Sequence, residues 1–425
     1  MSILIGIGLI VLALYGAPLF TIIGGVALLA FYSVNQSQVS VILELYRLAS
    51  TPVLIAIPLF TFAGYVLAES GTPKRLIQLS RALVGWMPGG LALVTVLTCA
   101  VFTAFTGATG VTIIALGGLL FPVLLKDAYS ERFSLGLITS SGNIGLLFPP
   151  SLPIILYGLV AQVSVDQLFA AGLIPGLLII AVMGSYVVLY ARKGSLTTHK
   201  FSWSVLGRAF IDAVWEVPLP FIIIIGIYGG FFTASEAAAI TAFYVLVVEF
   251  FIYRDLSLTK DLSGIIRDSM VLVGGVLIIL GSALGLANYM IDAQIPMKIL
   301  GFMQTFIHSK LVFLLTLNIF LLLVGAMLDI FSAILVVVPL LIPIATSFGV
   351  HPLHLGVIFI TNLSIGYLTP PVGMNLFIAS FRFNKSVLQL YAASLPFLGL
   401  LLLALLVITY VPELSLWLVR VFGIQ

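Results

Sequence analysis

The chain has 425 residues, of which 61% are hydrophobic and 8% are charged, and its mean hydropathy is +1.27. An ordinary soluble domain carries roughly 25% charged residues, so this composition excludes a water-facing surface and predicts a polytopic membrane protein. The net charge of +3 is distributed among polar loops and forms no nucleic-acid-binding face. The single cysteine, Cys99, excludes a disulfide framework, and we expect it to be a buried hydrophobic residue.

Polar breaks divide the chain into ten apolar stretches, which predict an all-α fold. They cover residues 3–31, 51–68, 91–125, 133–161, 168–190, 218–253, 269–290, 311–344, 355–381 and 387–410. Gly16-Ala17-Pro18 either leaves the first stretch whole or splits it into two short helices. We favour the split, which places the first residue outside.

Two of these stretches contain breaks at membrane depth. The stretch 91–125 has Thr106-Gly107-Ala108-Thr109-Gly110 at its middle, which predicts a re-entrant helical hairpin. The stretch 133–161 contains Ser140-Ser141-Gly142-Asn143 and then Pro149-Pro150. Proline has no amide hydrogen and clashes with the preceding turn, so this transmembrane helix must be broken.

The same pair of anomalies recurs 221 residues later, in a second hairpin at 311–344 and a second broken helix. The matched positions are Pro122 and Pro343, Gly145 and Gly366, and Pro149-Pro150 and Pro370-Pro371. Two halves that each contain a hairpin and a Pro-Pro-broken helix are typical of a secondary transporter, with its site where the halves meet.

The positive charges predict the topology. If both ends of the first hairpin are cytoplasmic, 14 of the 18 Lys and Arg residues fall in cytoplasmic loops, as the positive-inside rule requires. The second hairpin then enters from the opposite face, so the two repeats are inverted. Residues 74–87 and 297–308 precede the two hairpins and mix basic with apolar residues, which predicts interfacial amphipathic helices that frame the moving part.

Each hairpin tip and the broken helix after it supply oxygen atoms at one depth. Freed carbonyls and half-helix ends of this kind bind sodium in transporters, so we expect one sodium site per half. The candidates for the first site are Thr106, Gly107, Thr109, Ser141, Asn143 and Gly145. Those for the second are Asp329, Ser332, Asn362, Ser364 and Gly366. The candidates for the substrate cavity are Thr112, Ser140, Pro149, Pro150, Ser151, Thr369, Pro370, Pro371 and Asn375. The alternative for any one hydroxyl is an ordinary hydrogen bond between packed helices.

Charged residues within apolar stretches need a partner or a task, because an acid at membrane depth costs at least ~2.5 kcal/mol. We interpret Asp329 as a cation ligand or gating residue. Glu236 has a structural or gating role, and a capping box with Thr233 explains it equally well. We expect Glu249 at the membrane interface. His354 is expected, with His351, in a loop and not in a zinc site, so sodium is the only metal predicted.

Enzymatic motifs are missing from the sequence: it contains no HExxH, GxSxG or Walker loop, so transport must be driven by an ion and not by ATP. An intramembrane aspartyl protease would need a second intramembrane aspartate facing Asp329, and none is present in a matching helix. A purely structural membrane scaffold would not require two broken helices at matched positions.

The order of several motifs gives the chain a family resemblance over essentially its full length. These motifs are Ile57-Pro58-Leu59-Phe60 with Ala63-Gly64, Pro88-Gly89-Gly90-Leu91-Ala92, Phe148-Pro149-Pro150-Ser151 with Tyr157-Gly158, residues 168–176, residues 233–238, Asp329 and Pro370-Pro371. The chain resembles the large membrane subunit of tripartite ATP-independent periplasmic (TRAP) transporters. It departs from the family's usual pattern at the first hairpin tip, where Thr106 and Thr109 replace a Ser-rich segment, and at Ala234, where proline is usual.

The resemblance implies an elevator carrier in the bacterial inner membrane. Residues 1–90 would hold scaffold helices and the first arm helix, and 166–310 further scaffold helices and the second arm helix. Residues 91–165 and 311–385 would form the two halves of the transport domain, and 386–425 the last scaffold helix. A periplasmic binding protein would deliver an organic acid such as a dicarboxylate, sialic acid or another sugar acid, and sodium would drive uptake without any other cofactor.

The resemblance also implies a small four-helix membrane subunit. We expect it as a separate chain, because no such segment precedes Met1. A stand-alone divalent-anion/sodium symporter is the alternative, since it would share the hairpins and the inverted repeats but work without partners.

Overall fold

The structure is a computed structural model that describes residues 8, 11–12, 17–34, 37–193 and 201–423. All regular elements within these ranges are helical, and eight helices are long and apolar enough to cross a membrane, or nine if one bent pair counts as a span. The predicted all-α polytopic fold is therefore confirmed, and Cys99 is buried as expected. The proposed split of the first stretch falls largely outside the described residues, although α2 begins at Leu19, directly after Pro18.

The first half of the chain runs from α2 to α10. Its elements are α2 (Leu19–Ser33), α3 (Val39–Ala49), η1 (Pro52–Ile55), α4 (Ala56–Glu69), α5 (Thr72–Val84), α6 (Gly90–Thr106), α7 (Thr109–Lys126), α8 (Glu131–Ser141), η2 (Ile144–Leu147), α9 (Leu152–Ala161) and α10 (Val165–Lys193).

The second half begins with short helices and ends at α21. Its elements are α11 (Trp203–Asp212), α12 (Pro218–Tyr228), α13 (Ala234–Val247), the π-helical turn η3 (Val248–Ile252), α14 (Leu262–Asp292), α15 (Ile295–Gln304), α16 (Lys310–Met327), α17 (Ile330–Ser347), α18 (Pro352–Gly366), α19 (Met374–Phe383), α20 (Val387–Tyr410) and α21 (Glu413–Val421).

Two helical hairpins occur at the predicted places. Gly107 and Ala108 join α6 to α7, and Gly107 has φ +63°, a left-handed conformation that glycine adopts at a helix end without steric cost. Leu328 and Asp329 join α16 to α17. Asn143 and Ser364 are 221 residues apart. When this number is added to the residue numbers of α7, its bounds become those of α17.

Both helices that contain a Pro-Pro pair are broken. The first stops at Ser141 and resumes at Leu152 after η2, with a bend of 45°, and the second stops at Gly366 and resumes at Met374. A glycine in each break touches the first helix of its own hairpin. A Cβ atom on Gly145 would lie 2.3 Å from the Ala100 carbonyl oxygen, and one on Gly366 would lie 2.6 Å from the carbonyl carbon of Gly325. Each break therefore packs backbone against backbone on its hairpin.

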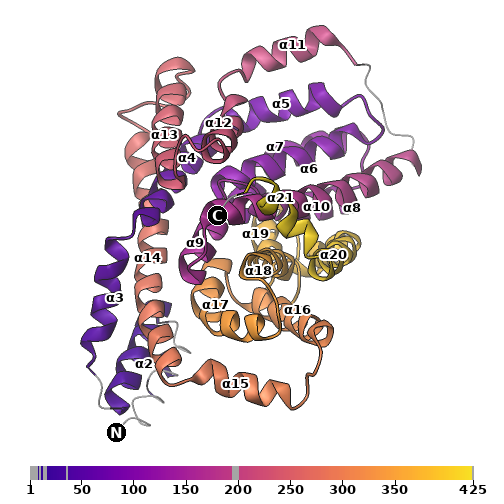
Figure 1. Ribbon diagram of the computed structural model, residues 1–425. Coiled ribbons are helices and arrows are strands. Elements are labelled where there is room, and N and C mark those ends of the chain that lie inside the picture. Colours follow the sequence, from indigo (N-terminus) through magenta and orange to yellow (C-terminus); the bar gives the residue numbers. More distant parts are fainter. Residues whose placement is uncertain (1–7, 9–10, 13–16, 35–36, 194–200, 424–425) are drawn as a thin grey trace.

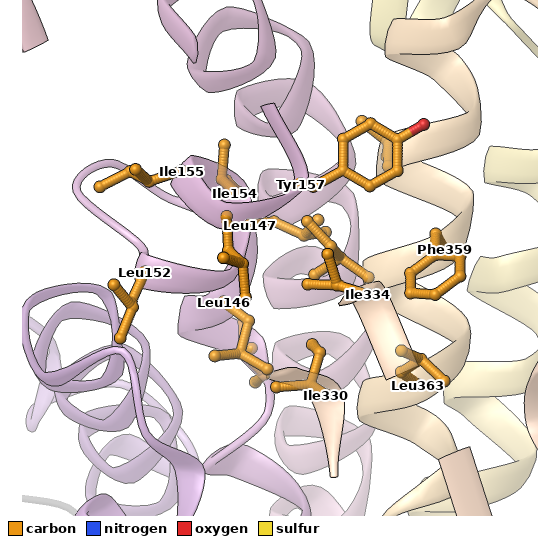
Figure 2. Packing of buried hydrophobic residues seen from close by; sticks show 14 of the residues in the cluster. Leu146, Leu147, Leu152, Ile154, Ile155, Tyr157, Ile330, Ile334, Phe359 and Leu363 are labelled. Atoms are coloured by element: carbon orange, nitrogen blue, oxygen red, sulfur yellow. The ribbon is translucent and has the colours of Figure 1, made fainter. Parts of the chain in front are cut away.

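Buried apolar side chains join the two halves, as Figure 2 shows. Leu146, Leu147 and Tyr157 of the first broken helix lie beside Ile334 and Phe359 of the second half. The Tyr157 hydroxyl donates to the carbonyl oxygen at the start of α18, at 2.9 Å. Because lipid tails are as apolar as these side chains, close van der Waals packing, more than transfer from solvent, holds such a contact together in a membrane.

The elements before the two hairpins lie toward opposite sides of the molecule: in Figure 1, α5 lies just beneath α11, which forms the upper edge, and α15 lies along the lower edge. Both amphipathic segments predicted before the hairpins are thus helical. Glu249, expected at the membrane interface, is fully buried within the protein, where Arg75 of α5 supplies its counter-charge. One expectation is wrong. His354 lies buried within α18, and not in a loop.

Candidate ion and substrate site where the broken helices meet

The tip of the first hairpin contacts the first helix break. The Thr103 hydroxyl donates to the carbonyl oxygen of Gly142 at 3.0 Å, and its oxygen lies 2.7 Å from the hydroxyl of Thr112. The Thr106 hydroxyl donates a hydrogen bond to the carbonyl oxygen of Phe102, one turn earlier in α6, at 3.1 Å. The break also contacts the hairpin at Thr109, because a Cβ atom on Gly142 would lie 3.3 Å from the Thr109 carbonyl oxygen.

A chain of buried amides then links this tip to the second half of the protein. The Thr109 hydroxyl donates to Oδ1 of Asn375 at 2.7 Å, and Nδ2 of Asn375 donates to Oδ1 of Asn143 at 2.6 Å. Nδ2 of Asn143 donates in turn to the carbonyl oxygen of Ser364 at 2.6 Å. Asn375, assigned from the sequence to the substrate cavity, thus also bonds two candidates for the first sodium site. Its side chain is completely buried.

Asp329 has a defined structural position at the start of α17. Its Oδ1 accepts hydrogen bonds from the backbone N–H groups of Phe331 and Ser332, both at 3.0 Å, and its Oδ2 accepts one from the Ser332 hydroxyl. The Tyr367 hydroxyl accepts the next orphan N–H, that of Ile330, at 2.5 Å. Asp329 is therefore the N-cap of α17, and it remains half-buried.

Several candidate oxygens have no hydrogen-bond partner anywhere in the described chain. These are Oγ of Ser140, Ser141 and Ser151, and Oδ1 of Asn362. The amide nitrogen of Asn362 is satisfied by Asn318 Oδ1, at 2.8 Å, so its oxygen alone is orphaned. Ser141 and Asn362 are separated by the same number of residues as Asn143 and Ser364. Ser141 is the last residue of α8, and Asn362 lies about one turn before the end of α18. Burying an oxygen atom without a hydrogen-bond donor costs folding free energy unless a bound ligand interacts with that atom.

The two Pro-Pro segments differ in exposure. Pro149, Pro150 and Ser151 are buried, whereas Pro370 and Pro371 are exposed. Thr369, before the second pair, is partly buried, and its hydroxyl donates to the Gly366 carbonyl at 2.8 Å.

The hairpin tips differ in the same way. The first tip is closed against α4, where a Cβ atom on Gly64 would lie 2.5 Å from the Phe105 carbonyl oxygen. At the second tip, Met327 and Leu328 are exposed. Among the substrate-cavity candidates, Pro370 and Pro371 are exposed and Thr369 is partly buried, whereas the others are buried.

Residues outside this region have structural roles. Glu236 and Thr233 form the capping box of α13, in which the Thr233 N–H donates to Glu236 Oε2 at 2.8 Å and the Glu236 N–H donates to Oγ1 of Thr233 at 3.3 Å. The ring nitrogens of His354 lie 3.1 Å from the Ser415 hydroxyl and from the Thr409 carbonyl, which ties α18 to the end of the chain. The capping interpretation of Glu236 is confirmed.

Two broken helices that meet in a buried polar network, within a bundle of membrane-length apolar helices, define the class of secondary membrane transporters. Comparison with known families gives the particular group. The family model described as "Tripartite ATP-independent periplasmic transporter, DctM component" matches residues 7–414. The chain belongs to this family of TRAP transporter large permeases and is a multi-pass protein of the bacterial inner membrane.

Individual relatives agree with this family. The chain is 34% identical, over 86% of its length and 85% of the relative's, to the C4-dicarboxylate TRAP transporter large permease protein DctM of Vibrio cholerae. It is 36% identical over 97% of its length to the isethionate TRAP transporter permease protein DctMQ of Oleidesulfovibrio alaskensis, but spans only 63% of that protein.

A solved structure with 15% identity shares the fold. The crystal structure of the Alcanivorax borkumensis YdaH transporter superposes with a TM-score of 0.62, covering 91% of this chain and 88% of that one.

Proposed function

We propose that this permease imports an organic acid together with sodium, and that a periplasmic binding protein delivers the acid. A dicarboxylate, sialic acid or another sugar acid is the proposed substrate class. The two relatives above are named for a C4-dicarboxylate and for isethionate, both small organic anions. A small four-helix membrane subunit completes the proposed assembly in the lipid bilayer.

The observation that carries the sodium proposal is the pair of orphan oxygens at matched positions. Ser141 Oγ and Asn362 Oδ1 are buried, neutral and without a donor among the described residues, and each stands beside a helix break that frees backbone carbonyls. Neutral hydroxyl, amide and carbonyl oxygens are suitable ligands for a monovalent hard cation. Thr106, Gly107, Thr109, Asn143 and Gly145 are the other proposed ligands of the first site.

The second proposed sodium site differs from the first because it includes a carboxylate. Asp329, the N-cap of α17, contributes a carboxylate and Ser332 a hydroxyl, while Ser364 and Gly366 lie in the last turn of α18, directly before the break. Because the cap uses only part of the Asp329 carboxylate's acceptor capacity, this group can still attract a cation. We therefore propose one sodium ion per half.

The unequal exposure of the two halves supports an alternating-access mechanism of the elevator type. The first hairpin tip is closed against α4 and the second Pro-Pro pair is open, as in one end state of a cycle that exposes the site to each side in turn. In this proposal the two hairpins and broken helices move together, while α4, α10, α13, α14 and α20 remain with the scaffold.

Uptake by site variants tests the proposal. Ser141→Ala and Asn362→Leu each remove one orphan oxygen and should raise the sodium concentration for half-maximal uptake in proteoliposomes, because each would remove one cation ligand. Ser394→Ala is a matched control, since Ser394 is also a buried orphan hydroxyl but lies in α20. Unchanged sodium dependence in both site variants would exclude these positions as ligands.

A further inference from the structure

A second buried polar centre, which includes none of the proposed ion ligands, lies around Arg75 of α5. Its guanidinium forms ion pairs with three carboxylates. Nη2 lies 2.9 Å from Glu249 Oε2, Nη1 lies 2.5 Å from Asp255 Oδ2, and Nε pairs with Glu216. The guanidinium carbon also lies 3.8 Å from the ring centroid of Tyr253.

These partners come from three scaffold segments. Glu216 lies just before α12, Glu249 lies in the π-helical turn η3, and Asp255 lies in the loop after it. The side chain of Glu249 is completely buried and that of Glu216 is 3% exposed. The π turn changes the face on which the end of the α13 helix presents its side chains, and such turns often occur at functional positions.

Neutral donors complete the bonding of the carboxylates. The Thr72 hydroxyl donates to Glu249 Oε1 at 2.8 Å, the Tyr253 hydroxyl donates to Glu216 Oε2 at 3.0 Å, and the Gly71 N–H donates to Asp255 Oδ2 at 2.9 Å. Thr72 and Gly71 belong to the amino end of α5, so this end is held to the scaffold by the arginine, a hydroxyl and the backbone itself.

The arrangement makes separation of α5 from the scaffold costly. Pulling Arg75 away would leave two buried carboxylates, Glu216 and Glu249, and the exposed Asp255 without their counter-charge, and breaking a buried pair costs far more than breaking an exposed one. Arginine is suited to this position because its planar fork reaches several acceptors at once, whereas a lysine ammonium is a single point charge.

The other end of α5 is built differently. Residues 85–89 connect it to α6, the first helix of the hairpin; they include Gly85 and Gly89, which has φ +75°, and α6 itself begins at Gly90. Glycine accommodates backbone rotation that other residues resist. The second arm helix, α15, has Pro296 at the position equivalent to Arg75, so this ion-pair cluster belongs to the first arm alone.

We propose that Arg75 is a positioning residue of the transport cycle. It holds the amino end of α5 on α12 and η3, so that displacement of the first hairpin takes place at residues 85–89 and not by tilting of the arm. This inference rests on the proposed elevator mechanism, to which it adds the residue that fixes one arm to the scaffold.

The test measures the position of α5 directly. In a Cys99→Ala background, spin labels at Gln78 of α5 and Phe243 of α13, both exposed, report the distance between arm and scaffold. The parent protein should give one narrow distance distribution with and without sodium. Arg75→Lys should broaden the distribution, because a lysine cannot bridge three carboxylates.

Transport provides the second readout. Arg75→Lys should lower the maximal uptake rate by about tenfold, through the lost multidentate contact, with the half-saturating binding-protein concentration unchanged. Arg81→Lys is the matched control, since this side chain lines the separate cavity between α5 and α11, and it should alter neither readout. If Arg75→Lys does not reach the membrane, Thr72→Val removes one donor and should produce a smaller broadening.

The distance measurement separates this inference from the proposed function. A broad distribution in the parent, or a distribution that neither Arg75→Lys nor Thr72→Val changes, would overturn the anchoring role, whatever the uptake rate. Uptake that proves independent of sodium would contradict the proposed function and leave the measured distance unaffected.

Discussion

The buried amide chain between the two halves allows a quantitative prediction. Asn375→Leu keeps the approximate size and shape of the side chain but removes its contacts to the Thr109 hydroxyl and to Asn143 Oδ1. A buried polar group left unsatisfied costs about 1–3 kcal/mol, and hydrogen bonds between membrane helices average about 0.6 kcal/mol. The substitution leaves both the Thr109 hydroxyl and the buried Asn143 Oδ1 without this partner. We expect a loss of about 1–4 kcal/mol in the free energy of unfolding.

Unfolding of the purified protein with a denaturing detergent measures this loss, and a double-mutant cycle assigns it. Thr109→Val removes the hydroxyl at the other end of the same bond, so the double variant should be less destabilised than the sum of the single variants. Residues in contact typically show coupling of about 0.5–3 kcal/mol. Effects of Asn375→Leu and Thr109→Val that simply add would refute the argument that these side chains form one network.

Three further substitutions follow from local geometry. Gly145→Ala should cost about 1–3 kcal/mol in the same unfolding assay, because its Cβ would overlap α6, while Gly399→Ala, where the Cβ meets nothing within 4 Å, should cost nothing; equal effects would disprove the close packing. Asp329→Asn should preserve membrane insertion and the cap of α17, because Asn caps a helix as well as Asp does. The same variant should impair uptake, and normal sodium-dependent uptake would show that the carboxylate has no role in the mechanism. Thr233→Ala should destabilise by about 1 kcal/mol through the lost cap and leave the sodium affinity unchanged; a shifted sodium affinity would give this region a functional role.

Local sequence patterns predicted the places where helices are interrupted or capped. The hairpin turn at Gly107, the breaks after Ser141 and Gly366, and the capping box of Glu236 all follow from glycine, proline and capping chemistry, which acts over a few residues. The span 387–410 also coincides with α20, because its length and apolar character leave few alternatives.

Other features depend on which helix faces meet, and that information is not local. Arg75 pairs with carboxylates 141 to 180 residues away, and its sequence neighbourhood is typical of an interfacial helix. Asn375 bonds Asn143 across 232 residues, and nothing in its local pattern distinguishes it from a cavity residue. The short helices α3, α11 and α21 were missed because they are brief and amphipathic, and so differ from membrane spans in composition.

The most direct test of the proposed function is uptake of organic acids into proteoliposomes that contain this permease and its small membrane partner. Uptake is measured with and without an inward sodium gradient, and with and without the binding protein. The proposal predicts accumulation only when both the gradient and the binding protein are present. Sodium-driven uptake without the binding protein would contradict the tripartite mechanism, and uptake without sodium would contradict the coupling ion.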